Sequence, residues 1–213
     1  MSNNDFPNEI PVFPLSNFII FPETTVPLNI FEPRYLQMID DSMKSHRLIG
    51  MIQPKKQIND TKPDLFNVGC VGKITSFNET EDGRYIIIIN GISRFKVLKE
   101  MESEKLYRIC KVNFDEFRQD LKSEEPKPEF NDLNFIFKNF RSLFKRQGYS
   151  INLQDLKNQS FDKTINSLAM ASPFSLEEKQ ILLETPSLNT RKVKLEEILK
   201  TYILDKFSNT TIQ

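Results

Sequence analysis

The stretch "IFEPRYLQMI", residues 30–39, places an acid and a base on either side of a proline, where a strand-like run gives way to a helical pattern. Glu32 and Arg34 could form an acid–base pair, a ligand site or a structural joint. Nucleophilic catalysis by serine or cysteine needs a histidine that a third group orients. The only histidine, His46, lies in a charged context after the helical pattern. We therefore interpret His46 as solvated, and Glu32 and Arg34 as structural.

The remaining reactive residue types predict no catalytic or metal site either. Cys70 and Cys110 lie far apart in apolar, strand-like contexts, which favours buried free thiols over a disulfide. Zinc sites recruit several His or Cys ligands, and the chain contains neither a P-loop nor a dinucleotide-binding glycine motif. A Ser–Lys dyad stays open, but no motif places one. The sequence thus predicts a protein without catalytic residues, metal or cofactor.

Net charge and hydropathy narrow the possible functional classes of the protein further. Lys and Arg together number 29, as do Asp and Glu, so the formal net charge is zero. Nucleic-acid binders usually carry a basic excess, which makes a nucleic-acid partner unexpected. The N-terminus lacks a basic and apolar leader pattern, and no apolar run reaches the length of a membrane span. We expect a cytoplasmic protein with no membrane contact.

Short strand patterns fill the first half of the chain. Six or seven short strands are expected from the runs 10–15, 18–22, 25–31, 47–53, 68–77, 84–90, 92–100 and 106–114. Pro11, Pro14 and Pro22 predict edges or strand ends, since proline cannot donate to a ladder. Asp82–Gly83 and Asn90–Gly91 predict hairpin turns. With one helix at about 33–45, opened by Pro33, the pattern favours a small twisted barrel or a sandwich.

The second half reads as helical. Residues 118–132 are charged and proline-containing, as in a linker, so we expect domains at 1–117 and 118–213. Ser175 and Glu178 form a predicted capping box at the start of one helix. Apolar stripes predict three others, formed by Leu133, Ile136, Phe137, Phe140, Leu143 and Phe144, by Ile165, Leu168 and Ala169, and by Leu195, Ile198, Leu199, Tyr202 and Ile203.

Two blocks of the chain resemble the N-terminal, substrate-binding domain of Lon proteases. The first is "PVFPLSNFIIFPETTVPLNIFEPRYLQMI", and the second is "VGCVGKITSFNETEDGRYIIIINGISRFKVLKE". The residues that carry the family pattern, as a structural signature, include Glu32, Pro33, Arg34, Tyr35, Gly83, Gly91, Arg94 and Phe95. Cys70 stands where the family usually has threonine. The helical half resembles the family's C-terminal helices less specifically.

The resemblance implies an α+β fold, with an N-terminal PUA-like β-barrel that carries one inserted helix and a C-terminal α-helical bundle. It implies a non-catalytic module that binds unfolded or degron-bearing polypeptides, as an adaptor in protein quality control or with a Lon-type protease in trans. Peptides could bind apolar grooves or a sheet edge. The candidate peptide-binding residues are Phe13, Phe21, Phe31 and Phe135, although a place in the core is the plainer interpretation of each aromatic.

Two alternatives stay open. PUA-like barrels also occur in RNA- or ribosome-associated proteins, although phosphate contacts need clustered cations. A small enzyme or small-molecule binder would need a deep pocket with converging ionisable groups. For the opening motif we expect Pro33 to fix the turn and Glu32 to cap the helix with its side chain. Arg34 should bridge to a carboxylate or to carbonyls of the barrel, and Tyr35 should pack inward.

Overall fold

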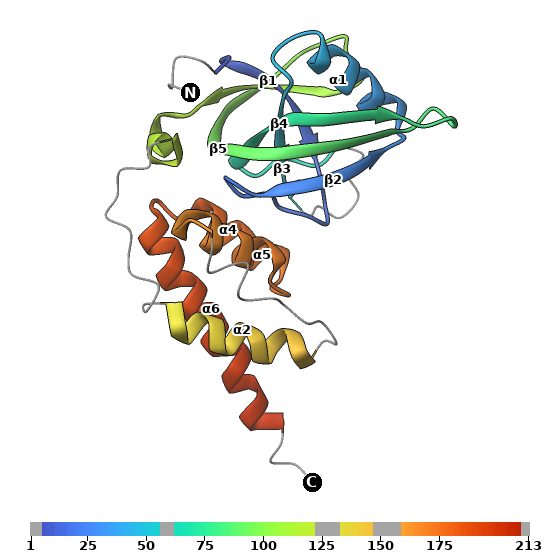
Figure 1. Ribbon diagram of the computed structural model, residues 1–213. Coiled ribbons are helices and arrows are strands. Elements are labelled where there is room, and N and C mark those ends of the chain that lie inside the picture. The colour runs from blue at the N-terminus through green and yellow to red at the C-terminus, as the bar shows by residue number, and fades with distance from the viewer. Residues whose placement is uncertain (1–5, 56–61, 122–132, 147–158, 210–213) are drawn as a thin grey trace. The chain divides into compact units, whose positions relative to one another are not determined.

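The computed structural model describes residues 6–55, 62–121, 133–146 and 159–209, and the chain divides into two compact units (Figure 1). The first unit is Met1–Glu124 and the second is Glu125–Gln213. The boundary expected between 117 and 118 falls inside η2, a short 3-10 segment at Asp115–Leu121 that belongs to the first unit.

A six-stranded sheet builds the first unit. Its strands are β1 (Glu9–Pro14), β2 (Thr25–Ile30), β3 (Leu48–Ile52), β4 (Val68–Glu79), β5 (Tyr85–Met101) and β6 (Arg108–Asn113). The strand order is β2-β5-β4-β3-β1-β6, and β6 also pairs with the end of β5. The pairings of β5, β4, β3, β1 and β6 therefore run in a ring, whereas β2 pairs with β5 alone. A core of buried apolar side chains, among them Ile10, Val71 and Phe95, lies within this unit.

Pro14 ends β1, as expected of a proline at a strand end, whereas Pro11 lies within the strand, and the strand is not at an edge of the sheet. β1 lies between β3 and β6, but it pairs with β6 over Glu9–Val12 and with β3 over Val12–Pro14. Pro11 and Pro14 therefore each have a paired strand on one side only, so a missing donor costs no ladder bond.

The segment 18–22 does not form the expected strand. Instead, the Phe21 amide donates to the Thr24 hydroxyl at 3.1 Å, and that hydroxyl donates to the Phe21 carbonyl at 2.6 Å. A side chain three residues away thus satisfies the backbone groups that a ladder would use.

One of the two predicted hairpins forms. Gly83, with φ of 77°, donates its N–H to the Thr80 carbonyl at 2.9 Å between β4 and β5. Asp82 is not among the residues with positive φ, so this is a turn with a left-handed glycine rather than the expected type I′ turn. The second hairpin prediction is wrong, because Asn90 and Gly91 lie inside the continuous strand β5. A Cβ on Gly91 would lie 2.2 Å from the Phe21 carbonyl oxygen, so the glycine permits a close backbone approach rather than a turn.

The opening motif forms the start of helix α1, Pro33–Met43, with Pro33 in the first turn as expected. Two predicted roles are wrong. Glu32 makes no side-chain cap, and Arg34 reaches back to the Glu32 carboxylate at 2.7 Å instead of to the sheet. Tyr35 is buried as predicted, with its ring centroid 4.1 Å from that of Phe13 on β1.

The other face of α1 holds the sheet through carboxylates. The Tyr85 hydroxyl donates to Asp40 at 3.0 Å, and the Tyr107 hydroxyl donates to Asp41 at 2.9 Å. Burial and the Asp41 bond raise the pKa of Tyr107 to about 12, which keeps its proton in place at neutral pH.

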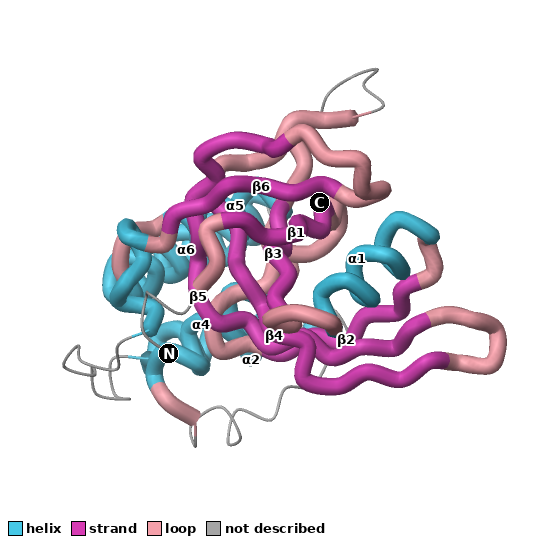
Figure 2. The backbone as a smooth tube through the Cα atoms, turned by 90° about the horizontal axis from the view of Figure 1, so that it is seen from above, coloured by secondary structure: helices cyan, strands magenta, loops and turns pink. Residues whose placement is uncertain are grey.

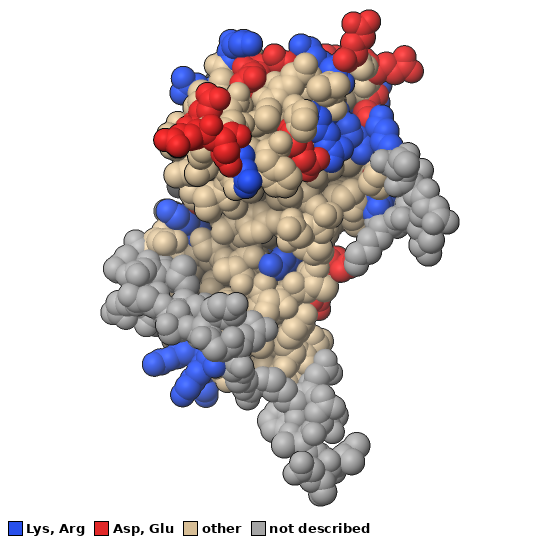
Figure 3. Space-filling model, turned by 90° about the vertical axis from the view of Figure 1, so that its right-hand side faces the viewer, with Lys and Arg blue, Asp and Glu red and all other residues tan. Residues whose placement is uncertain are grey.

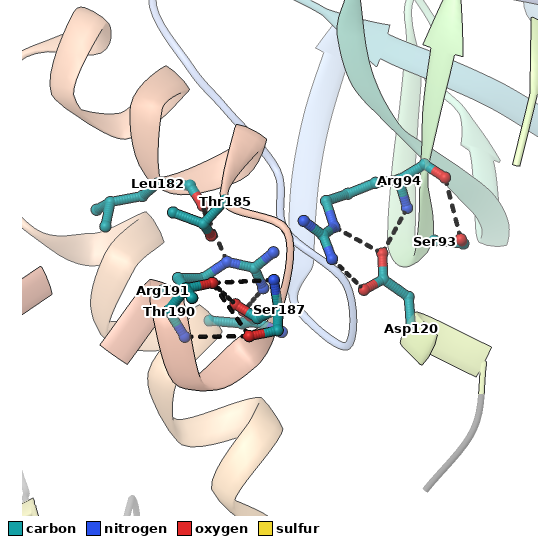
Figure 4. A network of polar contacts seen from close by, with 9 residues as sticks. Ser93, Arg94, Asp120, Leu182, Thr185, Ser187, Thr190 and Arg191 are labelled. Carbon is teal, nitrogen blue, oxygen red and sulfur yellow. Dashed lines mark hydrogen bonds and ion pairs between the residues drawn. The ribbon is translucent and has the colours of Figure 1, made fainter. Parts of the chain in front are cut away.

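A buried ion pair attaches η2 to β5 (Figure 4). Arg94, which is 1% exposed, donates from Nη2 and Nε to Asp120 at 2.7 and 2.8 Å, while its guanidinium lies over the Phe117 ring. The bidentate contact and the ring satisfy a cation that burial alone would destabilise. Arg94 therefore has a structural role, and Phe95 beside it lies fully in the core.

In the described part of the second unit, the helices are α2 (Asn134–Arg146), α4 (Phe161–Ala171), α5 (Leu176–Glu184) and α6 (Leu188–Asn209). Helix α6 contacts the other three. The predicted capping box is confirmed, since Ser175 Oγ accepts from the Glu178 amide at 3.1 Å and Glu178 accepts from the Ser175 amide at 2.8 Å. Buried Arg191 donates to the Leu182 carbonyl and to Asn166, which ties α6 to α5 and α4 (Figure 4).

Candidate peptide-binding surface

Four consecutive isoleucines in β5 face alternately into and out of the first unit. Ile87 and Ile89 are fully buried, whereas Ile86 is 45% exposed and Ile88 is partly exposed. Side chains alternate between the faces of a strand, so an isoleucine run must present half of its members to the outside. Two apolar side chains consequently form a stripe on the outer face of the sheet.

Polar side chains flank this stripe on both neighbouring strands. Asn29 of β2 and Asn78 of β4 lie opposite Ile86, which makes a row across three strands. The next row places Pro27 and Ser76 beside Ile88. The outer face thus combines an apolar centre with two primary amides, which can donate to and accept from a polypeptide backbone.

Further exposed apolar residues lie close to this row. Phe31 directly follows β2 and is 62% exposed, the largest exposed fraction of any phenylalanine in the described chain. Phe77 is 38% exposed and packs edge-on against Tyr85, with ring centroids 4.8 Å apart. A hollow at the end of the β4–β5 hairpin includes Asn29, Asn78 and Ile86 in its lining. Figure 2 shows this hairpin reaching beyond the rest of the sheet with β2 alongside. We call the residues Asn29, Phe31, Asn78, Ile86 and Ile88 the outer sheet surface.

Charges border the outer sheet surface at the hairpin. Glu79, Glu81, Asp82 and Arg84 line the same hollow, and Arg84 pairs with Asp82 at 2.9 Å. A hydrogen bond from the Thr80 hydroxyl, together with Arg84, lowers the pKa of Asp82. Figure 3 views the molecule from the hairpin side and shows uncharged surface between acidic and basic groups. This arrangement, an apolar patch with a polar rim, is typical of a protein-binding surface.

The four phenylalanines predicted to bind peptide divide between core and surface. Phe13 and Phe21 are buried, so they offer no area to a partner, whereas Phe31 and Phe135 are exposed. Phe31 lies at the outer sheet surface, and Phe135 belongs to the second unit. Ile86 was not among the predicted residues. The run "IIII" could have indicated it, because successive side chains of a strand point to opposite faces, so two of the four isoleucines must face outward.

Among the described residues, no group of three or more His, Cys, Asp or Glu could hold a metal ion. Both cysteines are free and buried, as predicted, and burial is the main cause that raises the pKa of Cys110 to about 11. His46 is exposed after α1. None of the described helices is both long and apolar enough to cross a membrane.

Known structures share this fold. The crystal structure of a Lon N-terminal domain protein from Xanthomonas campestris aligns with a TM-score of 0.60 and 22% identity, covering 90% of this chain and 97% of that one. The N-terminal domain of Mycobacterium avium complex Lon protease gives 0.60 and 17%, with 90% and 98% covered. The chain therefore has the Lon N-terminal domain fold, a mixed α/β architecture with a six-stranded sheet and helices.

Sequence comparison leads to the same family. Lon protease of Dictyoglomus thermophilum is 24% identical over 192 residues, and Lon protease of Buchnera aphidicola subsp. Baizongia pistaciae is 28% identical over 199. These matches cover 90% and 92% of this chain but only 24% and 25% of the relatives, so the chain spans about a quarter of their length. The family model of the ATP-dependent protease La (LON) substrate-binding domain matches residues 9–201. The chain belongs to the Lon substrate-binding domain family.

Proposed function

We propose that this protein binds unfolded or degron-bearing polypeptides on the outer sheet surface and catalyses no reaction itself. The observation that carries the proposal is the exposed isoleucine stripe between two asparagine side chains, in a chain that belongs to a substrate-binding family. Burying an apolar side chain of this size stabilises a complex by about 1.5–3 kcal/mol. Unfolded chains expose such apolar side chains, whereas folded proteins hide most of them.

Binding across the face of the sheet fits this surface better than the addition of a strand. β2 ends the strand order and pairs with β5 alone, so its outer edge is the place for an added strand. Pro27 lies in the middle of β2 and provides no backbone donor there. Side-chain contacts with Ile86 and Phe31 would therefore supply most of the affinity.

The cellular location, the partner protease and the type of each unit belong to the same proposal. We place the protein in the cytoplasm, where it would act as an adaptor in protein quality control, with a Lon-type protease as its partner in trans. We further propose that the ring of paired strands is a PUA-like barrel and that the second unit is a helical bundle. The strand pairings and the contacts of α6 support these assignments.

A binding assay with matched variants tests the proposal. A labelled client protein, either folded or denatured by reduction and alkylation, is titrated with the protein, and fluorescence polarisation is recorded. The denatured client should bind more tightly. Ile86→Ser and Phe31→Ser should each weaken that binding by about three- to tenfold, since each removes part of the apolar contact.

Leu98→Ser is the control, because Leu98 is 55% exposed on β5 but lies outside the outer sheet surface. It should leave binding unchanged. Equal affinity for folded and denatured client would refute polypeptide binding. An equal loss in all three variants would refute the location.

A further inference from the structure

Helix α2 presents two chemically opposite faces. Its buried side consists of Ile136, Phe137, Phe140, Leu143 and Phe144. Lys138, Arg141 and Lys145 are exposed on the other side. At about 100° per residue these three positions fall within roughly 60° of the helix circumference, so they form one stripe. The helix contains no acidic residue.

The charges of this stripe are unpaired as far as the described residues go. In the parts of the chain that the structure describes, none of the three cations has a carboxylate within salt-bridge distance. The lysines of α6 differ, because Lys192 pairs with Glu196 at 3.3 Å and Lys194 pairs with Glu197 at 2.5 Å. Figure 3 shows basic side chains gathered at the lower left, over the helical unit. Among the described residues, the α2 stripe is therefore a positive surface without a paired carboxylate.

An exposed aromatic ring adjoins the stripe. Phe135, at the start of α2, is 40% exposed, and Lys200 of α6 places its Nζ 5.5 Å from the centroid of that ring. Lys200 is itself exposed and adds a fourth cation. We call Phe135, Lys138, Arg141, Lys145 and Lys200 the α2 basic surface.

We propose that the α2 basic surface binds acidic polypeptide segments that also carry an aromatic or apolar residue. Carboxylates would pair with the cations, and the apolar side chain would lie against Phe135. Proteins that bind single-stranded nucleic acid combine cations with several aromatic rings on which successive bases stack, whereas Phe135 is the one ring of the α2 basic surface. The choice of a polypeptide as the partner rests on the proposed function, and the surface adds a preference for acidic segments.

The test compares two pairs of neutralised lysines. Lys138→Gln with Lys145→Gln removes two charges of the α2 basic surface, whereas Lys192→Gln with Lys194→Gln removes two paired charges of α6. A short labelled peptide of alternating Glu and Phe is titrated against each full-length variant. Since an exposed ion pair contributes about a two- to fivefold change in affinity, the first variant should bind about tenfold more weakly. The second should bind like the unchanged protein.

Raising the salt concentration should weaken binding to the unchanged protein more than binding to the Lys138/Lys145 variant, since salt screens exposed charges. Equal losses in both variants would overturn the proposal. So would tighter binding of a single-stranded oligonucleotide than of the peptide, which would assign the surface to nucleic acid.

A denatured client without acidic clusters separates this inference from the proposed function. It should bind the Lys138/Lys145 variant as well as it binds the unchanged protein, because it uses the outer sheet surface. If that client fails to bind while the acidic peptide binds, the proposed function fails and the α2 basic surface stands. If the client binds and the peptide does not, the proposal for the α2 basic surface fails and the proposed function stands.

Discussion

At the scale of single residues, charged groups in this protein act differently according to burial. Arg34 and Glu32 form an exposed pair of the kind that contributes little to stability, although they are the residues that first suggested chemistry. Arg94 and Asp120 form a pair that is almost fully removed from water. The energetic importance of an ion pair in this chain therefore follows its surroundings rather than its position in the family signature.

The buried pair gives the first prediction. Asp120→Ala should lower the free energy of unfolding of the first unit by about 3–5 kcal/mol, because it leaves the Arg94 cation buried without its carboxylate. Urea denaturation followed by circular dichroism measures the loss. Asp115→Ala, which removes the exposed partner of Arg118 in the same segment, should cause no resolvable loss. Comparable losses in the two variants would contradict this role.

Tyr107 gives a prediction on pH. Its pKa is raised to about 12, chiefly by burial and then by the bond to Asp41, so the folded state holds the proton more tightly than the unfolded chain does. The free energy of unfolding should therefore fall as the pH rises from about 10 to about 12. Tyr107→Phe should flatten this part of the profile of melting temperature against pH. An unchanged slope in that variant would assign the effect to other groups.

At the scale of elements, strand alternation and helix caps could be predicted, but pairing could not. Glu178 and Ser175 identify their helix start because the capping bonds are local. The continuous β5 was missed because Asn90–Gly91 reads as a turn. Only the approach of Phe21, a residue far away in sequence, explains that glycine. The expected cap by Glu32 failed because Arg34 bonds its carboxylate instead.

The two glycines of β5 and its hairpin make a matched pair for mutation. Gly83→Ala should lower the free energy of unfolding of the first unit by about 1–2 kcal/mol. An added Cβ would meet no atom within 4 Å, so the left-handed backbone conformation is the only penalty. Gly91→Ala should destabilise the first unit more, because its Cβ would lie 2.2 Å from a backbone oxygen. Thermal unfolding of both variants decides the order. A larger loss for Gly83→Ala would show that backbone strain outweighs the close approach.

At the scale of the whole molecule, each unit has a core of its own. Phe95 lies in the buried cluster of the first unit, whereas Leu168 and Leu195 are buried in the second. The sequence predicted this change from strands to helices near residue 118, because the hydrophobic period itself changes. Of the proposed outer sheet surface it named only Phe31, since the exposure of Phe31 and the burial of Phe13 depend on packing that periodicity does not encode.

Separate cores predict separable unfolding. Calorimetry should resolve two transitions, and Leu168→Ala should lower the midpoint of one of them while leaving the other in place. Leu168 is 1% exposed, so the substitution should lower the free energy of unfolding of the second unit by about 2–5 kcal/mol. Gly91→Ala should move the other transition. A single transition that shifts as a whole in both variants would show that the units unfold together.

The attachment of η2 has a mechanical consequence. Leu121 ends this segment, and the first unit ends at Glu124, so a pull on the chain from the C-terminal side reaches the sheet through η2. Asp120 transmits that load to Arg94 in β5, a strand that pairs with β2, β4 and β6. The tension is thus distributed over three neighbouring strands before any one of them can peel away. The Arg94–Asp120 pair therefore helps the first unit to resist a force applied to the chain on its C-terminal side.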